Sequence, residues 1–342
     1  MNRLAYSAGA AIAVCGLGIS AAQAEDLVLR YNRWIPPSHH IQVRMMEPWA
    51  KQVAEATKGR VKIEFTASSL GAPPRQFDLA ADGVADLTFG NHDYTPARFT
   101  LTQVAQLPFL SDSAEALSVA FWRTQQKFFE QSKEHAGVKL LALFVHGPGQ
   151  VFTASKPIAK LGDFAGVKLR SAGASTADIA KAFGAVPISA PATQAYELLS
   201  NGVADGTFFH SDGLVSFKLE KLMKYQTRFP GGLYNSTFFF VINQAKWDKI
   251  SPEDQRAIMA LSGEAFARMA GKVWDDQDVI AKREMEKVGT QVTSASPELL
   301  AEAKTKLKTE ETKWIAAASA KKIDAAAALA FLRAEVAAYK PQ

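Results

Sequence analysis

The stretch GVKLRSAGASTADIAKAFGAVPISAPATQAYELLSNGVADG, residues 166–206, decides the fold. Apolar and polar residues alternate over 166–173, which predicts a strand, and a helical pattern follows near 175–183. A second strand is expected in AVPISA (185–190) and a second helix near 193–201. Strands that alternate with helices of this length indicate crossover connections, so we predict an α/β fold with largely parallel sheet.

The same alternation extends outward through the chain of 342 residues, which is long enough for two domains. A Ser-Pro pair at 251–252, followed by two acidic residues, is typical of a helix start, and we expect one long helix from there to 288. The Ala- and Lys-rich tail, 297–340, predicts two more helices. Further strands are expected at 27–34, 60–67, 85–90, 138–145 and 238–243, and further helices at 41–58, 71–83 and about 113–135.

The tetrapeptide GVAD occurs twice, at 83–86 and 202–205. In each copy we expect the glycine to close a helix in a left-handed cap, the valine to fold back onto that helix, and the aspartate to open a short strand. Two lobes of similar design would produce such a pair of turns. Chance recurrence in an α/β protein is the alternative.

The N-terminus predicts a cleaved signal peptide over residues 1–24. A short apolar stretch follows Arg3 and ends in Ala22-Gln23-Ala24, the small-residue pattern of a cleavage site. Lipid attachment at Cys15 is the alternative, but Val14 precedes it where such a site has glycine or alanine. The mature chain would then hold no cysteine, as suits an oxidising periplasm, and would not be embedded in a membrane. Its basic residues exceed its acidic ones by only a few and are scattered, which argues against nucleic acid as a partner.

A search for catalytic and metal-binding motifs predicts neither an enzyme nor a cofactor. The nucleophile elbow, the P-loop, the dinucleotide-binding glycines and the zinc-protease motif are all missing from the sequence. The neighbouring histidines His39 and His40 are expected in a surface loop, not at a metal. The carboxylates of WDDQD (274–278) are expected on a solvated helix face. We therefore predict no catalytic residue and no metal ligand.

Arg170 is the strongest candidate for ligand binding. It stands where the strand of GVKLRS ends and a loop begins, and in open α/β sheets the carboxyl ends of strands line the ligand crevice. Its guanidinium carries a rigid fork of N–H donors that matches a carboxylate. A surface salt bridge is the alternative reading.

The residues from 166 to 206 resemble the central signature of the solute-binding subunits of tripartite ATP-independent periplasmic (TRAP) transporters, the DctP-like family. The signature reads roughly G-[hydrophobic]-K-[hydrophobic]-R, then G-A-x-P, [E/Q]-x-Y-x-x-L and G-V-x-D-G. The likeness continues through VAEATKGRVKIEF (53–65), AQLPFLSDSAEA (105–116) and WDKISPEDQRAI (247–258). It covers nearly the whole mature chain.

This resemblance implies a two-lobed periplasmic binding protein fold, type II-like, whose lobes are linked by crossing strands and a long helix. One lobe would hold residues 25–147 and about 235–275, and the other 148–234 with part of 276–342. Arg170 would clamp a ligand carboxylate, and the loaded receptor would dock on the transporter's membrane subunits. A monomer is expected.

Two departures from the family pattern bear on the ligand. Many relatives carry a second arginine where HGPGQ (146–150) places Gly149, and a polar run where this chain has Phe208, Phe209 and His210. Less charge and more aromatic surface favour a monocarboxylate with an apolar, aromatic or 2-oxo body. A C4-dicarboxylate receptor and a secreted enzyme on the same scaffold are the alternatives. The remaining ligand-binding candidates are Asn91, Trp34 and Tyr234.

Overall fold

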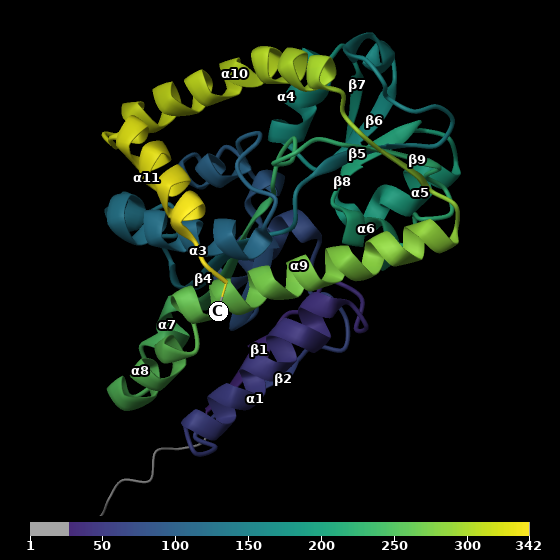
Figure 1. Cartoon of the computed structure of the whole chain (residues 1–342). Coiled ribbons are helices and arrows are strands. Elements are labelled where there is room, and N and C mark those ends of the chain that lie inside the picture. Colours follow the sequence, from purple (N-terminus) through teal and green to yellow (C-terminus); the bar gives the residue numbers. More distant parts are fainter. Residues whose placement is uncertain (1–26, 342) are drawn as a thin grey trace, which may run out of the picture.

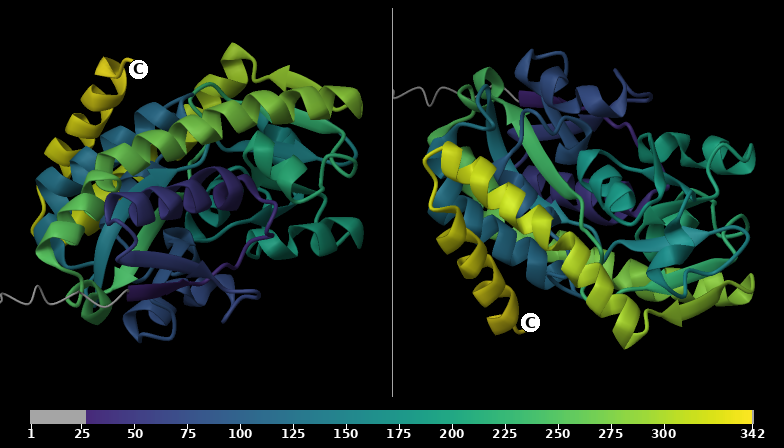
Figure 2. Two further views of the ribbon diagram at one scale, coloured as in Figure 1. Left: turned by 90° about the horizontal axis from the view of Figure 1, so that it is seen from below. Right: turned by 90° about the horizontal axis from the view of Figure 1, so that it is seen from above.

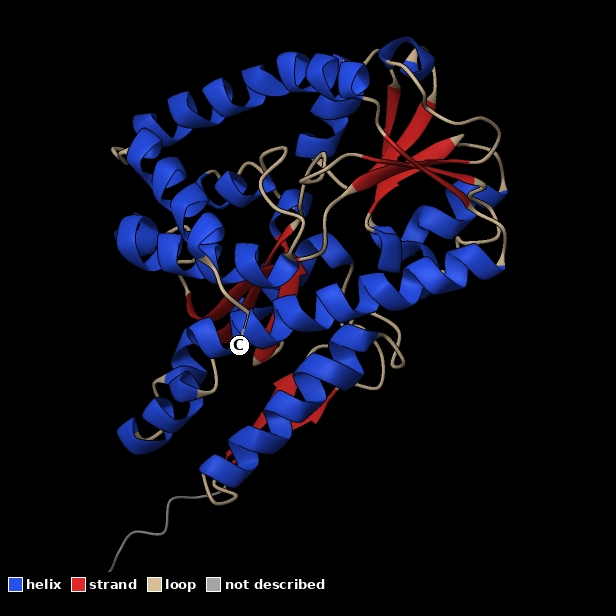
Figure 3. Ribbon diagram, in the orientation of Figure 1, coloured by secondary structure: helices blue, strands red, loops and turns tan. Residues whose placement is uncertain are grey.

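The computed structural model describes residues 27–341 (Figure 1). The expected signal peptide, its cleavage after Ala24 and Cys15 lie outside the described residues, so those predictions stay predictions. The described strands form two separate sheets, each covered by helices (Figure 3). No helix among the described residues combines the length and the apolar character that a membrane crossing requires.

The first sheet has five strands in the order β2-β1-β3-β10-β4, and the second has six in the order β11-β9-β5-β8-β6-β7. The strands of the first sheet are β1 (Leu27–Tyr31), β2 (Val61–Phe65), β3 (Leu87–Asn91), β4 (Val138–Val145) and β10 (Thr237–Asn243). Those of the second are β5 (Gln150–Thr153), β6 (Lys168–Ser171), β7 (Val186–Ser189), β8 (Gly206–Phe209), β9 (Tyr225–Arg228) and β11 (Gln291–Ser294). We call the units around them the first and the second lobe.

Each sheet is parallel except for one strand. In the first sheet β10 runs antiparallel to β3 and β4, and in the second β5 runs antiparallel to β8 and β9. These are the two strands by which the chain enters a lobe from the other one, β5 after β4 and β10 after β9. The sequence pattern predicted parallel pairing because helices separate most of the strands. It did not predict these two antiparallel strands, since the chain enters each of them directly from the other lobe.

The helices alternate with the strands as the periodicity indicates. They are α1 (Glu47–Ala56), α2 (Gln76–Ala81), α3 (Ala114–Thr124), α4 (Ala174–Ala182), α5 (Ala195–Ser200), α6 (Ser211–Ser216), α7 (Gln244–Trp247), α8 (Pro252–Ala260), α9 (Gly263–Lys287), α10 (Pro297–Ala320) and α11 (Ala325–Ala338). Short π-helices cover Ile41–Met46 and Gln125–Phe129. Short 3-10 helices cover Pro73–Arg75, His92–Tyr94, Leu101–Gln106, Glu130–Ser132, Leu161–Phe164 and Ala192–Gln194.

The single helix expected over 251–288 is two helices, α8 and α9. Ser251 caps α8 as predicted, accepting a hydrogen bond from Asp254 N at 3.1 Å. The break falls at the pair Ser262-Gly263, where the Ser262 hydroxyl bonds Ile258 O at 2.8 Å and Gly263 takes a φ of 54°. A Ser-Gly pair interrupts a helix readily, because the glycine adopts the left-handed conformation without strain.

Both GVAD segments form the same turn. Gly83 and Gly202 have φ values of 72° and 68°, so each closes its helix in the left-handed region as predicted. In the first lobe Asp86 Oδ2 accepts a hydrogen bond from Arg30 N at 2.7 Å, and in the second lobe Asp205 Oδ2 accepts one from Lys168 N at 2.9 Å. These matching contacts place the two copies at equivalent positions in two lobes of similar design.

The valines of the two turns do not fold back onto their helices. Val84 and Val203 are each 45% exposed, whereas the alanines that follow, Ala85 and Ala204, are buried. The physical reason is that the left-handed glycine turns the chain, so the second residue after it faces the core.

The cap at Gly202 offers a test of this geometry by substitution. Gly202→Ala is expected to lower the free energy of unfolding by about 1–2 kcal/mol, because an L side chain is strained at this φ although nothing lies within 4 Å of the added methyl group. Gly162→Ala is the matched control: its methyl group also meets nothing within 4 Å, and its φ is not in the strained range. Urea unfolding of the two variants measures the difference, and equal stabilities would contradict the strain argument.

Two long helices, α9 and α10, each span both lobes (Figure 2). Phe266 near the start of α9 packs in the core of the first lobe, and Met285 near its end packs in a core cluster of the second. In α10 the order is reversed, with Leu299 in the second lobe and Trp314 in the first. The lobe boundaries predicted from the sequence remain a proposal.

Candidate functional site

A pocket lies between the two lobes, beside the segments by which the chain crosses from one to the other. The space inside it, open solvent included, is about 450 Å³. Its lining comes from loops at the carboxyl ends of strands in both lobes, from β10 and from α9. The lining residues are Trp34, Ile35, His39, Ile41, Asn91, Tyr94, His146, Arg170, Ala172, Ala192, Phe209, His210, Phe217, Tyr234, Ser236, Phe238 and Trp274.

Arg170 is the one permanently charged side chain among the described residues that line this pocket. It lies on β6 and is 1% exposed. Its Nε donates to Ala190 O at 2.9 Å and its Nη1 to Phe208 O at 3.4 Å, while Nη2 has no hydrogen-bond partner. A buried cation with a free donor is costly unless a polar or anionic group joins it.

Side chains from the loop after β3 and from the crossing segment lie next to Arg170. Burial lowers the pKa of the Arg170 guanidinium, and the neighbouring Tyr94, Tyr234 and Asp93 oppose that shift. Burial raises the pKa of Asp93, whose carboxylate accepts hydrogen bonds from the Ser175 hydroxyl at 2.8 Å and from Ser175 N at 3.3 Å. The Tyr94 hydroxyl accepts a bond from Ala192 N at 3.1 Å. Both contacts join the loop after β3 to the second lobe beside Arg170.

Aromatic rings make up most of the remaining wall. The Arg170 guanidinium lies over the Phe209 ring, 4.9 Å from its centroid, which gives a cation–π contact. Trp274, from the middle of α9, stacks on Phe238 with 6.3 Å between ring centroids and meets His210 edge-on at 4.6 Å. Trp34 stacks on Phe89 at 5.0 Å and donates its indole N–H to Phe89 O at 2.8 Å. A flat apolar ligand body fits such walls.

Burial favours the neutral form of His146 and His210, two of the three histidines that line the pocket. Burial lowers the pKa of His146 to about 4 and that of His210 well below its usual value. His146 Nε2 accepts a hydrogen bond from Ser236 N at 2.9 Å, so its proton is on Nδ1, which contacts Gly147 O. His210 Nδ1 accepts a bond from Gly213 N at 3.0 Å. Neither histidine therefore supplies a second positive charge.

Tyr234 occupies the space that a side chain at position 149 would need. A methyl group added to Gly149 would lie 2.2 Å from the Tyr234 ring. The backbones of the two residues also pair, with Gly149 N donating to Tyr234 O at 2.8 Å. This pairing joins the two crossing segments, 146–149 and 229–236, directly beside the pocket.

The structure brings together six of the seven ligand-binding residues proposed from the sequence. Arg170, Phe209, His210, Asn91, Trp34 and Tyr234 all line the pocket. Phe208 does not, because successive side chains of a strand point to opposite faces, and its ring packs in a core cluster of the second lobe. Only the Phe208 carbonyl oxygen takes part, as an acceptor for Arg170.

Sequence reasoning missed several lining residues, Trp274, Tyr94, His146 and Phe217 among them. WDDQD was expected on a solvated helix face, yet Trp274 is 1% exposed. Asp275 of the same segment accepts hydrogen bonds from the Ser113 hydroxyl and from Ala114 N, at 2.8 and 2.7 Å. The helix is packed on two sides because it passes between the lobes, which a single-helix pattern cannot reveal.

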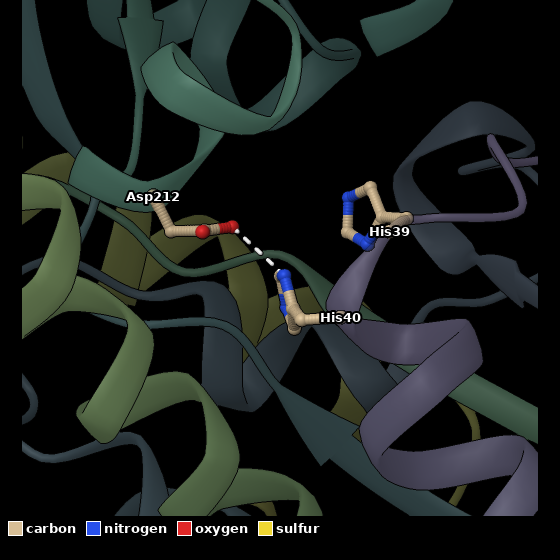
Figure 4. A group of neighbouring side chains, drawn as sticks. All are labelled: His39, His40 and Asp212. Carbon is tan, nitrogen blue, oxygen red and sulfur yellow. Dashed lines mark ion pairs between the residues drawn. The ribbon is translucent and has the colours of Figure 1, made fainter.

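His39 and His40 were expected in a surface loop, and that prediction is wrong. Each is 5% exposed, because Phe217 packs against the His39 ring and Trp274 of α9 packs against both rings. His39 lines the pocket, and His40 meets the Trp274 ring edge-on at 4.3 Å between centroids. Figure 4 shows both rings facing Asp212 of α6.

Comparison with known proteins identifies the family. Residues 34–316 match the family model described as bacterial extracellular solute-binding protein, family 7, or DctP. The chain belongs to this family. The match covers most of the chain, which confirms the resemblance to TRAP solute-binding subunits and the two-lobed fold.

Individual relatives match over nearly their whole length. The outer membrane transporter protein TsaT of Comamonas testosteroni is 31% identical over 93% of this chain and 94% of its own. A TRAP solute-binding protein from Bordetella bronchiseptica, solved with bound (R)- and (S)-mandelate, is 42% identical with a TM-score of 0.89, over 91% of this chain and 99% of that one. A marine metagenome TRAP protein, solved with 3-hydroxybenzoate, is 31% identical with a TM-score of 0.86, over 92% and 99%.

Proposed function

We propose that this family 7 receptor captures an aromatic monocarboxylate and holds its carboxylate on Arg170. The observation that carries the proposal is the buried Arg170 guanidinium, whose Nη2 has no partner, in a pocket walled by aromatic rings. A charge-assisted hydrogen bond from that nitrogen would satisfy both the donor and the ligand. The mandelate and 3-hydroxybenzoate held by two relatives support this ligand class.

Among the described lining residues, no lysine or arginine other than Arg170 could pair with a second carboxylate. Gly149 carries no side chain, and Tyr234 fills the space beside it. Burying a second negative charge without a partner costs several kcal/mol, so a C4-dicarboxylate should bind far more weakly than benzoate. The site residues Arg170, Phe209 and Trp274 thus select one charge and one ring.

Delivery to membrane subunits of an ion-gradient-driven TRAP transporter is part of the proposal, as is location in the periplasm. Both rest on family membership and on the signal peptide predicted over residues 1–24. We further propose a monomeric receptor without catalytic activity. Incubation with benzoate or mandelate should return the acid unchanged, and turnover would favour the enzyme alternative.

A ligand screen by thermal shift tests the proposed class. Benzoate or mandelate at about a thousand times its Kd should stabilise the folded protein by about 4 kcal/mol, because only the native state binds the ligand. Benzamide is the matched control, since it keeps the ring and loses the charge, and we expect no shift with it. Succinate and malate should give little or none. A shift with succinate and none with benzoate would instead establish the dicarboxylate alternative.

A further inference from the structure

We propose that His39, His40 and Asp212 form a site for a divalent transition metal ion at the junction of the two lobes. The three side chains offer ligand atoms that all lie within 4.8 Å of one another, and all three residues are buried. His39 and His40 come from the first lobe, and Asp212 comes from α6 of the second (Figure 4). The site goes beyond the proposed function and does not depend on it.

The nitrogens of His40 are the first observation in favour of a metal. His40 Nδ1 lies 3.2 Å from Asp212 Oδ2, yet neither ring nitrogen of His40 has a hydrogen-bond partner. A buried polar atom without a partner calls for a bound group that satisfies it. Two ligand atoms of a tetrahedral zinc ion stand about 3.4 Å apart, given metal–ligand distances of about 2.1 Å, so this pair already has the required separation.

The charge around Asp212 is the second observation. Its carboxylate is bonded to the Ser216 hydroxyl at 3.1 Å, and Asp278 Oδ1 accepts a hydrogen bond from Asp212 N at 3.0 Å. Asp212 is 3% exposed, and its ion-pair partner among the described residues is His40, whose ring nitrogens lack hydrogen bonds. A buried carboxylate is normally paired or bound to a metal, so a divalent cation fits this position.

The donor set favours zinc, cobalt, nickel or copper over calcium or magnesium. Two imidazoles and one carboxylate suit the former ions, whereas the latter prefer oxygen ligands alone. Both imidazoles are buried, at 5% exposure each, so an ion bound between them would be shielded from solvent.

Metal binding by His39 would break one hydrogen bond. Its Nδ1 accepts a hydrogen bond of 3.2 Å from Ile41 N. A neutral imidazole has one lone pair, so this bond is given up whichever ring nitrogen binds the ion. One long hydrogen bond is a small loss beside a metal–nitrogen bond.

The position of the site links metal binding to closure of the lobes. His40 and Asp212 can share an ion only when the lobes are as close as in this structure, so the metal should favour the closed form. A ligand that also favours the closed form would then tighten metal binding, and the metal would tighten the binding of that ligand by the same factor.

The test uses the mature protein, purified without a histidine tag and freed of metal by chelator. Titration with Co²⁺ should give the visible absorption of a low-symmetry cobalt site at one ion per chain, and Zn²⁺ should displace it. Asp212→Asn and His40→Gln should each weaken the binding of either ion by at least about a hundredfold, because each removes a direct ligand.

Asp276→Asn is the matched control, because Asp276 lies on α9 near the site but pairs with Arg44 and Lys272 at the surface. It should bind Co²⁺ as the wild type does. Failure of metal-free wild type to bind Co²⁺ and Zn²⁺, or equal binding by Asp212→Asn and His40→Gln, would overturn the site. Benzoate binding measured in the presence of chelator tests the proposed function separately.

Discussion

Arg170→Ala is expected to weaken benzoate binding by at least about a hundredfold while the protein stays folded. Removing one partner of a buried, hydrogen-bonded charge pair costs about 2–5 kcal/mol or more, because the ligand carboxylate is left buried without its cation. The side chain is 1% exposed and has a free Nη2, so nothing else in the lining can take its place. Isothermal titration calorimetry with benzoate measures the loss.

The ligand-free Arg170→Ala variant should unfold at a temperature close to that of the wild type. The substitution removes two hydrogen bonds to the carbonyls of Ala190 and Phe208, but it also removes a buried charge whose desolvation opposes folding. Arg170→Lys is the conservative control: it keeps the charge and loses the fork of donors, so affinity should fall by an intermediate factor. Unchanged affinity in Arg170→Ala would sink the proposed role of Arg170.

The strand–helix alternation and the position of Arg170 at the end of a strand followed from the sequence pattern, and the two-lobed architecture was implied by the family resemblance. Strand–helix alternation and the end of β6 are local properties, and so is the left-handed glycine that closes each GVAD turn. The likeness of the two turns fitted either two similar lobes or chance, and their matching hydrogen bonds favour two similar lobes. These features depend on a few consecutive residues, which is why the pattern revealed them.

The rest of the site depends on contacts between distant segments. His39 and His40 look like loop residues until aromatic rings from distant segments pack against them, and Trp274 looks like one residue of a charged helix face until Phe238 lies beside it. Phe208 and Phe209 are indistinguishable without the strand's orientation, which places one ring in the core and the other in the pocket. These contacts form between segments that are far apart in the sequence, so a local sequence pattern does not reveal them.

Gly173→Ala is expected to weaken ligand binding by about a hundredfold by preventing full closure of the lobes. A methyl group on Gly173 would lie 2.1 Å from the Asp93 carbonyl oxygen, across the boundary between the lobes. A displacement of about 1 Å at a binding site can cost about a hundredfold, and a backbone oxygen cannot turn away as a flexible side chain can. Gly173 has a φ of −169°, which alanine adopts freely, so the second lobe itself should fold normally.

Two further variants separate closure from folding. Ser175→Ala removes only the hydroxyl bond to Asp93, and we expect a loss of about tenfold or less. Gly162→Ala adds a methyl group that meets nothing within 4 Å, and its benzoate affinity should equal that of the wild type. Small-angle X-ray scattering with saturating benzoate should show a more open Gly173→Ala protein than the wild type. A compact, closed Gly173→Ala complex with unchanged affinity would show that the Asp93–Gly173 contact has no part in closure.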